Sequence, residues 1–356
     1  MFQFPGFLVV YVKPRPQNLS SISDSGLFTP QERTMKNADA LSLAQAANSN
    51  VVKVTSIRSI ARLWAGMGHI QSLTCQTKDK DNVEIIAKQI SCPNPRSFGD
   101  KRKAASYHVE ANFYEKHSST LHDQGICCQG LHVANDGRGE ISILMTPLPH
   151  HTLHYMSGDT ADAAIRSVAR LHASFWGVKA DEAVEEGGLA PQGCYWYLDT
   201  RPDEFESMSN RGVEGMLKRA ARAIDEKLKS NPYQTVCHGD LKACNMSLST
   251  DTNYVTLVDF QYVGKACFAK DLAYLFVCGM DVDSDFEERQ EEAYLNLYLK
   301  ELQKNGVQRD ELPSLEEAVH ALDLAYCDLY RWMCGWGVWG NGFLSDRVER
   351  CLDQIL

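Results

Sequence analysis

Along residues 51–147 the hydrophobic positions come in short runs that alternate with polar ones, the pattern of half-buried β-strands. Two of these runs flank a polar turn of lysines and aspartates and predict a β-hairpin. A helical stretch and one more strand then lead to prolines 147 and 149, which predict a hinge. The expected elements are strands at 72–77 and 83–90, a helix at about 102–118 and a strand at 141–145.

After the hinge the hydrophobic positions recur at helical spacing. Between residues 165 and 175 they are three or four positions apart, and residues 212–229 and 285–304 repeat this pattern. The chain is therefore expected to be an α+β protein of two lobes. Residues 51–147 would form a small β-rich N-lobe, and residues 148–356 a larger, mainly helical C-lobe.

The first 50 residues follow neither pattern. Pro14, Pro16, Pro30 and several serines interrupt them, so residues 1–50 are expected to form a mobile N-terminal extension. The apolar run 2–12 is too short to span a bilayer, and no cationic residue precedes it; a signal peptide is the minor alternative. No membrane span is expected elsewhere either.

Charge and cysteine usage narrow the functional classes. The 356 residues include 36 lysines and arginines against 46 aspartates and glutamates, a net charge of −10, so a nucleic-acid partner is not expected. The twelve cysteines are scattered and form no C-x-x-C pair. Reduced, mostly buried thiols in a cytoplasmic protein are expected, with a disulfide framework as the alternative. The composition does not predict an oligomeric state.

The strongest chemical pattern is H-G-D-L-K-A-C-N at residues 238–245, followed by D-F-Q at 259–261. Phosphoryl transfer from ATP needs one carboxylate near the acceptor hydroxyl and oxygen ligands that hold Mg2+ on the phosphates. Asp240 is the candidate for the first role, and Asn245 and Asp259 are the candidates for the second.

The spacing of these residues has a structural reason. Residues 246–248 and 254–258 are strand-like and are separated by a polar turn. If they pair as a hairpin, Asn245 and Asp259 lie opposite each other at its open end. The alternative is an accidental H-x-D followed by an unrelated D-F.

A lysine and a glutamate in the N-lobe would complete a nucleotide site. Strand alternation puts Lys88 on the same face as Ile86 and Ile90, where an ammonium group is costly to bury without anionic partners. Glu110 on the expected helix is the candidate carboxylate, because a Lys–Glu pair positions the phosphates in kinases. The alternative puts Lys88 at a solvated strand edge and Glu110 on an exposed helix face.

Gly66 and Gly68 lie between two strand-like stretches upstream of Lys88. Without side chains they would let backbone N–H groups approach phosphates closely. A G-x-G sequence often marks only a turn, which is the alternative for these two glycines.

Three polar residues have expected supporting roles in the catalytic segment. His238 would orient the loop through hydrogen bonds and would not act as the base. Lys242 would either touch the transferred phosphate or be solvated. Asp271 would either brace the loop by accepting backbone hydrogen bonds or cap a helix.

Together these residues resemble the aminoglycoside phosphotransferase and choline kinase superfamily, and most closely its ecdysteroid-kinase-like branch. That branch carries H-G-D-x-x-x-x-N, D-F-Q and a helix ending L-H-A-x-F-W, present here at residues 238–245, 259–261 and 171–176. The resemblance covers about residue 60 to the C-terminus. It implies a bilobal protein-kinase-like fold, ATP, Mg2+ and phosphorylation of a hydroxyl of a small molecule. The acceptor would be a choline-like amine, a sterol, a sugar or an aminoglycoside.

Two other functions stay open. A protein kinase is disfavoured because Gln261 replaces the glycine of D-F-G, Asp271 follows Phe260 by only eleven positions, and no A-P-E follows. That spacing leaves little room for a segment that docks a peptide. A pseudokinase that binds a nucleotide or a partner without turnover is disfavoured by the intact lysine, asparagine and aspartates.

A stripe of aromatic residues near the C-terminus is the candidate acceptor site. Asp328, Trp332, Trp336 and Trp339 are spaced by four, four and three positions and would share one helical face. Such a wall would suit a quaternary amine through cation–π attraction, or a flat apolar sterol. The alternative is that these tryptophans pack the core of the C-lobe.

Overall fold

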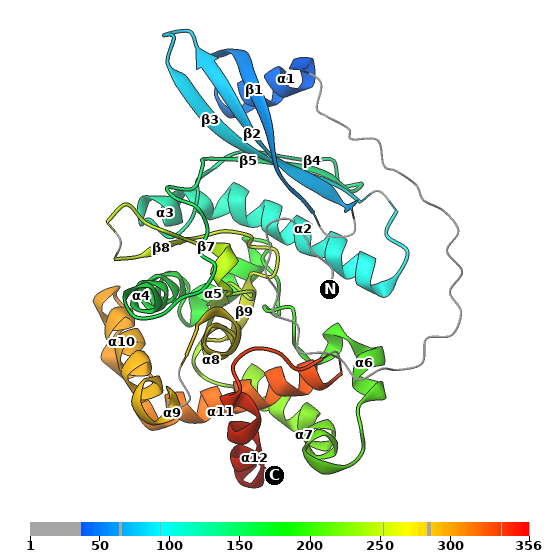
Figure 1. Ribbon diagram of the computed structural model, residues 1–356, viewed down its shortest axis with the longest axis vertical. Coiled ribbons are helices and arrows are strands. Elements are labelled where there is room, and N and C mark those ends of the chain that lie inside the picture. The colour runs from blue at the N-terminus through cyan, green and yellow to red at the C-terminus, as the bar shows by residue number, and fades with distance from the viewer. Residues whose placement is uncertain are drawn as a thin grey trace.

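In the computed structural model the chain forms two lobes, a β-sheet lobe and a larger helical lobe (Figure 1). The structure describes residues 37–63, 66–92, 94–251, 253–282, 286–335 and 337–355. The predicted α+β class, with a β-rich N-lobe and a mainly helical C-lobe, is confirmed. Within the described residues no helix is long and apolar enough to cross a membrane.

The N-lobe contains a five-stranded antiparallel sheet in the order β1-β2-β3-β5-β4. Its strands are β1 (Val51–Arg62), β2 (Gly68–Thr77), β3 (Asn82–Ser91), β4 (Gly130–Asn135) and β5 (Glu140–Met145). The predicted hairpin is β2 and β3. Strand β3 is central, and its Lys88 lies opposite Ile70 on β2 and Ile143 on β5. A lysine is therefore buried in the middle of the sheet.

Helix α1 (Asn37–Ala47) packs against this sheet. Ala40 and Ala44, one turn apart, are fully buried in a cluster that includes Leu73 and Leu144. The prediction that residues 1–50 form a mobile extension is therefore wrong for residues 37–50, since small side chains let the helix lie closely on the sheet. The rest of that extension, residues 1–36, lies outside the described residues.

Helix α2 (Phe98–Lys116) runs beneath the sheet (Figure 1). It starts four residues earlier than predicted because Ser97 and Asp100 form a capping box, in which each side chain accepts a hydrogen bond from the other's backbone N–H. Its buried face carries Glu110 and Phe113. The Phe113 ring stacks on Phe260 of the D-F-Q segment, with 3.8 Å between centroids.

The C-lobe is a group of helices around one core. Helix α4 packs against α10, and α11 packs against α7, α8 and α12. The helix predicted at 212–229 is α7, whereas the one predicted at 285–304 is interrupted between α9 and α10. The remaining helices are α3 (Ser118–Asp123), α4 (Asp159–Ser174), α5 (Val178–Glu185), α6 (Pro202–Ser207), α7 (Gly212–Lys229), α8 (Ala269–Tyr274), α9 (Phe286–Arg289), α10 (Glu291–Lys304), α11 (Leu315–Cys334) and α12 (Phe343–Ile355).

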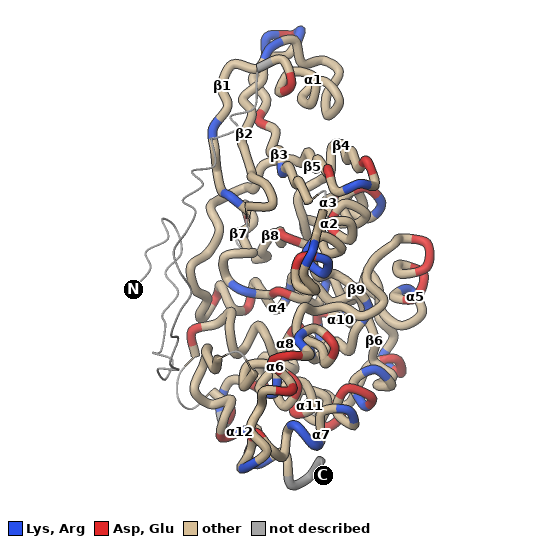
Figure 2. Tube along the Cα trace, turned by 90° about the vertical axis from the view of Figure 1, so that its right-hand side faces the viewer, with Lys and Arg blue, Asp and Glu red and all other residues tan. Residues whose placement is uncertain are grey.

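Two small antiparallel sheets hold the H-G-D and D-F-Q segments. Strand β6 (Gln234–Cys237) pairs with β9 (Gly264–Cys267), and β7 (Met246–Leu248) pairs with β8 (Val255–Leu257). The predicted hairpin is β7–β8. All twelve cysteines are free, and nine are buried. In the side view the two lobes are stacked along the long axis, and acidic and basic residues are interspersed (Figure 2).

Candidate active site

Lys88 joins three elements at the boundary of the lobes. Its Nζ lies 2.7 Å from Glu110 Oε2 on α2 and 2.8 Å from Asp259 Oδ1 in the loop after β8. Lys88 and Glu110 are buried, whereas the side chain of Asp259 is 33% exposed. The predicted Lys88–Glu110 pair is present, and the alternative of a solvated strand edge and an exposed helix face is wrong.

For Lys88, Glu110 and Asp259, burial and the neighbouring charges shift the pKa values in opposite directions. Burial disfavours the ammonium form of Lys88, yet the carboxylates of Asp259 and Glu110 raise its pKa above the ordinary value. Burial raises the pKa of Glu110 to about 7, although Lys88 acts to lower it. Burial also acts to raise the pKa of Asp259, but nearby lysines, Lys88 first, hold it below its usual range. Asp259 therefore remains ionised and able to bind a cation.

The backbone at Asp259 is unusual. Its φ is 68°, in the left-handed region that residues with a side chain seldom occupy. Such conformations cost of the order of 1–3 kcal/mol and concentrate at functional sites. The conformation places the Asp259 carboxylate against Lys88.

Asp240 lies in the loop between β6 and β7 and is buried. Asn245 Nδ2 donates to its backbone oxygen at 2.9 Å and to its Oδ2 at 3.2 Å, and Lys242 Nζ pairs with Oδ2 at 2.8 Å. Its Oδ1 is buried and accepts no hydrogen bond from any described residue. A buried acceptor without a partner is costly, so this oxygen could accept a hydrogen bond from a bound molecule. Lys242 pairs with Asp240 while its side chain stays 40% exposed, so it is partly solvated, and contact with a transferred phosphate stays a prediction.

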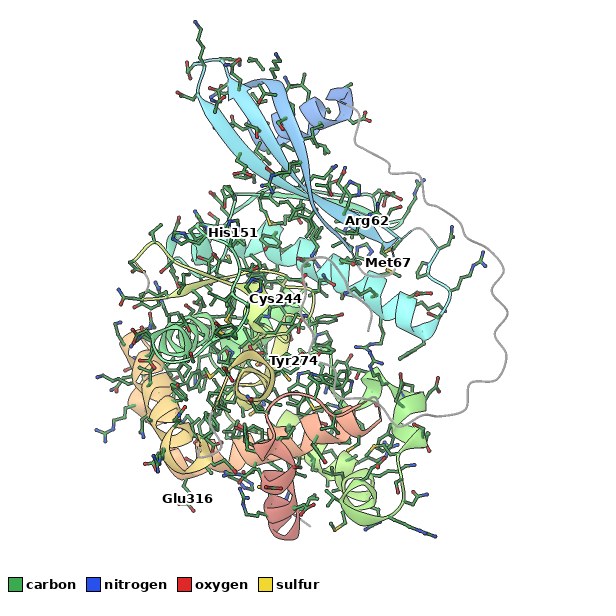
Figure 3. All side chains as sticks on the ribbon, viewed as in Figure 1. Arg62, Met67, His151, Cys244, Tyr274 and Glu316 are labelled. Atoms are coloured by element: carbon green, nitrogen blue, oxygen red, sulfur yellow. The ribbon has the colours of Figure 1, made fainter. Side chains whose placement is uncertain are left out.

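The predicted β7–β8 hairpin forms with Asn245 and Asp259 at its open end, but its register puts Val258 opposite Asn245, so Asp259 lies one residue beyond the predicted pair. The N–H of Val258 donates to the Asn245 backbone oxygen at 3.0 Å, which closes the hairpin. Because Asn245 Nδ2 faces Asp240, its side-chain oxygen points away and has only a weak contact with the Cys244 thiol, at 3.8 Å. Figure 3 shows Cys244 at the boundary of the lobes, with Tyr274 below it.

Asp271 braces the catalytic loop. Its Oδ2 accepts from the His238 N–H at 2.6 Å, and its Oδ1 accepts from the Gly239 N–H at 2.9 Å. The first of its two predicted alternatives is therefore confirmed, since the cap of α8 is Phe268, without a side-chain hydrogen bond.

The sequence did not predict that His172 and Tyr298 would support Asp271 from the side away from the catalytic loop. His172 Nε2 lies 3.1 Å from Asp271 Oδ2, and His172 Nδ1 lies 2.7 Å from the Tyr298 hydroxyl, all buried. His172 belongs to the L-H-A sequence that contributed to the family resemblance, and that motif was the available indication of its role. Together these side chains connect α4 and α10 to the catalytic loop.

His238 has the predicted orienting contacts. Its Nε2 lies 3.0 Å from the Val258 carbonyl oxygen, and the Asp240 N–H approaches its Nδ1 at 3.3 Å. A carbonyl only accepts and an N–H only donates, so these partners assign the proton to Nε2. Both ring nitrogens of His238 therefore have a backbone hydrogen-bond partner.

The two glycines lie where β1 turns into β2. Gly66 has φ of 71°, which favours glycine, and a Cβ there would meet no atom within 4 Å. A Cβ on Gly68 would lie 2.0 Å from the Gln89 backbone oxygen, so packing against β3 alone requires that glycine. Binding of phosphates by this turn stays a prediction.

The predicted helical stripe is wrong in two respects. Helix α11 ends at Cys334, so Trp339 lies beyond it and cannot share its face; Trp336 lies outside the described residues. Asp328 is buried and both its oxygens are engaged, at 2.8 Å from Lys270 Nζ and 2.6 Å from Arg331. This carboxylate therefore locks α8 to α11 and is not open to an acceptor.

An aromatic cluster nevertheless forms in the C-lobe around Trp332. We define it as Tyr195, Tyr274, Trp332 and Trp339. The Tyr195 ring lies 5.0 Å from that of Trp332, which lies 5.2 Å from that of Trp339, and the two tyrosine hydroxyls are 2.5 Å apart. Burial raises the pKa values of both tyrosines, and the Asp240 carboxylate adds to the shift, as the next cause for Tyr195 and after Tyr195 and Cys278 for Tyr274.

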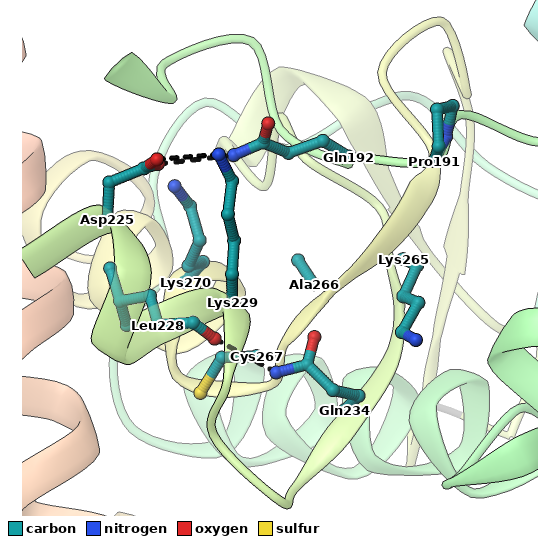
Figure 4. A pocket seen from close by; sticks show the side chains of 10 residues that line it. All are labelled: Pro191, Gln192, Asp225, Leu228, Lys229, Gln234, Lys265, Ala266, Cys267 and Lys270. Atoms are coloured by element: carbon teal, nitrogen blue, oxygen red, sulfur yellow. Dashed lines mark hydrogen bonds and ion pairs between the residues drawn. The ribbon is translucent and has the colours of Figure 1, made fainter. Parts of the chain in front are cut away.

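A separate pocket of about 330 Å³ is lined by side chains from α7, β6, β9, α8 and the chain before α6 (Figure 4). None of the predicted site residues lines it. Its three lysines are already paired, Lys229 with Asp225, Lys265 with Asp181 and Lys270 with Asp328. The pocket is therefore a poor site for phosphates.

Comparisons with known proteins place this site in a family. No curated protein matches the sequence. Among solved structures, an amicoumacin kinase in complex with AMP-PNP, Ca2+ and Ami is 13% identical, with a TM-score of 0.47 over 89% of this chain and 92% of that chain. The ethanolamine kinase of Plasmodium vivax is 13% identical, with a TM-score of 0.44 over 85% and 82%. An aminoglycoside phosphotransferase from Streptomyces rimosus is 17% identical, with a TM-score of 0.40 over 85% and 98%.

The family model described as the phosphotransferase enzyme family matches residues 94–311, more than half of the chain. The matched region includes Glu110, the whole H-G-D and D-F-Q segments and Asp271. The chain therefore belongs to the phosphotransferase enzyme family.

Proposed function

We propose that this protein transfers the γ-phosphoryl group of ATP, with Mg2+, to a hydroxyl group of a small molecule. The observation that carries the proposal is the buried Oδ1 of Asp240, which has no partner among the described residues while Oδ2 is held by Asn245 and Lys242. An acceptor hydroxyl that donates to Oδ1 would satisfy this oxygen and be oriented for attack.

The residues around Asp259 fit a divalent cation and phosphates. Asp259 is ionised and partly exposed, and the side-chain oxygen of Asn245 points away from Asp240. Carboxylate and amide oxygens are the ligands that Mg2+ prefers, so these two residues would hold it. Lys88, held by Glu110, would contact the phosphates, and bound metal would neutralise the charge that develops on them.

The segment after D-F-Q supports a small acceptor in preference to a protein. Strand β9 pairs with β6 immediately after this segment, and α8 begins at Ala269. A protein kinase would need room here for a segment that docks a peptide. The partly exposed members of the aromatic cluster, Tyr195 and Trp339, would instead offer aromatic surface for a choline-like amine, a sterol, a sugar or an aminoglycoside.

The proposal extends to the cellular compartment and to the branch of the superfamily. The twelve free cysteines favour a reducing compartment such as the cytoplasm. The L-H-A, H-G-D and D-F-Q sequences favour the ecdysteroid-kinase-like branch of the superfamily.

The experiment is an ATP-consumption screen of the purified protein against hydroxylated metabolites, with the product mass measured. Asp240→Asn should reduce turnover of the accepted substrate by at least about a hundredfold, the size of general-base effects, while binding of AMP-PNP stays within about twofold. Asp199→Asn, at an exposed aspartate, is the matched control. Turnover near wild type in Asp240→Asn would refute the assigned role, and AMP-PNP binding without turnover of any acceptor would favour a pseudokinase.

A further inference from the structure

Gln261 connects helix α2 to Asp259. It is buried, and its Nε2 donates to Asp259 Oδ1 at 2.5 Å. Its Oε1 accepts from Lys103 Nζ at 2.5 Å and, more weakly, from Ser106 Oγ at 3.5 Å. Lys103, Gln261 and Asp259 thus form a chain of two hydrogen bonds that crosses from the N-lobe helix to the D-F-Q segment.

Lys103 determines which way the Gln261 amide points. An ammonium group only donates, so it selects the amide oxygen and leaves the amide nitrogen facing Asp259. Lys103 itself is held in place, because its Nζ donates to the Tyr262 hydroxyl at 3.1 Å. The same Nζ lies 5.2 Å from the ring centroid of Tyr107 and 5.1 Å from that of Tyr262, within cation–π range.

Gln261 in turn determines which oxygen of Asp259 is free. Oδ1 accepts from both Lys88 Nζ and Gln261 Nε2, whereas Oδ2 accepts no hydrogen bond from the described part of the chain. Rotation about the last bond of an aspartate side chain is soft, and one donor restrains it less than two. The pair of donors therefore fixes the carboxylate with one oxygen occupied and the other available.

We propose that Lys103 and Gln261 are positioning residues that hold Asp259 with Oδ2 toward the divalent cation. This inference rests on the proposed function, in which Asp259 binds that cation. It gives a physical role to the glutamine of D-F-Q, since the glycine of D-F-G has no side chain with which to donate to the aspartate. Neither residue touches the reacting atoms; both act through Asp259.

The test measures binding of Mn2+ with AMP-PNP to the full chain, by calorimetry and by electron paramagnetic resonance of the bound Mn2+. Lys103→Met keeps most of the unbranched side chain without its charge, and Gln261→Leu removes the donor. Each should weaken Mn2+ affinity about tenfold, as expected for a lost hydrogen bond to a charged group. Lys103→Arg should restore it. Lys101→Met, at an exposed lysine of the same helix, should have no effect.

Two further readouts separate positioning from a purely structural role. The double variant Lys103→Met/Gln261→Leu should bind Mn2+ no more weakly than either single variant, because the two residues act in series. The melting temperatures of all variants should stay close to wild type. Unchanged Mn2+ affinity in both single variants, additive losses in the double variant, or loss of melting temperature alone would overturn the inference.

The outcomes also distinguish this inference from the proposed function. If the wild-type protein binds Mn2+ with AMP-PNP and Asp259→Ala does not, the function stands while the two positioning residues are judged on their own variants. If the wild-type protein binds neither, or Asp259→Ala binds as well as wild type, the proposed metal site fails and the inference fails with it.

Discussion

Glu110 is the buried carboxyl partner of Lys88, and burial shifts its pKa toward neutrality. Burial raises it from 4.5 to about 7 in the ligand-free protein, so the carboxyl is protonated below that pH and Lys88 loses an anionic partner. We expect kcat/KM for ATP to rise with pH through about 7, because this ratio reports the free enzyme. Glu110→Gln should abolish this rise and lower the plateau. A rise with the same midpoint in the variant would assign it to another group.

The same shift affects folding stability with a definite sign. Between about pH 4.5 and 7 the native state retains the Glu110 proton more tightly than the unfolded chain does. The contribution of Glu110 to the free energy of unfolding therefore decreases as the pH rises through this interval.

Asp259 and Asn245 should differ in their importance for the cation. A carboxylate holds Mg2+ more strongly than a neutral amide does, and Asp259 also pairs with Lys88. We expect Asp259→Ala to weaken Mg2+-dependent ATP binding at least about tenfold more than Asn245→Ala, measured by calorimetry with and without Mg2+. Equal, metal-independent affinities in both variants and the wild type would refute the metal roles.

At the scale of elements, the end of helix α11 separates two tryptophans with different roles. Trp332, on the helix, is 4% exposed, whereas Trp339 lies beyond its end and is only partly buried. We expect Trp339→Ala to raise the acceptor KM about threefold to tenfold with little change in melting temperature, as for loss of one aromatic contact. Trp332→Ala should instead destabilise the fold by about 3–5 kcal/mol. An unchanged acceptor KM in Trp339→Ala would remove this residue from the acceptor site.

At the scale of the whole molecule, the larger of two buried apolar clusters extends across both lobes, while the smaller one lies between α1 and the N-lobe sheet. The main cluster of buried apolar residues runs from Ile90 in the N-lobe to Leu352 in α12. Phe113 and Phe260 stack where it crosses between the lobes. We therefore expect one cooperative transition in scanning calorimetry, and Phe113→Ala should lower the free energy of unfolding by about 3–5 kcal/mol. Two resolved transitions in the wild-type protein would contradict a shared core.

The sequence alone determined those helices and hairpins that depend on residues close together in the chain. The β2–β3 and β7–β8 hairpins and helix α7 follow from short-range periodicity and turn composition, and the second hairpin brings Asn245 and Asp259 to its open end. For Lys88 the strand pattern predicted that a buried ammonium group needs an anionic partner, and the kinase Lys–Glu arrangement indicated Glu110 as that partner. Family resemblance supplied the expectation of ATP and Mg2+.

Only the tertiary structure decided the partners of the other charged residues of the site. Asp328 was predicted to face an acceptor and instead pairs with Lys270 and Arg331, because its position on α11 turns it into the core. Likewise Lys103 and Gln261 are 158 positions apart, and no local pattern relates them. Periodicity identifies the face of an element on which a residue lies, but long-range packing determines which other element covers that face.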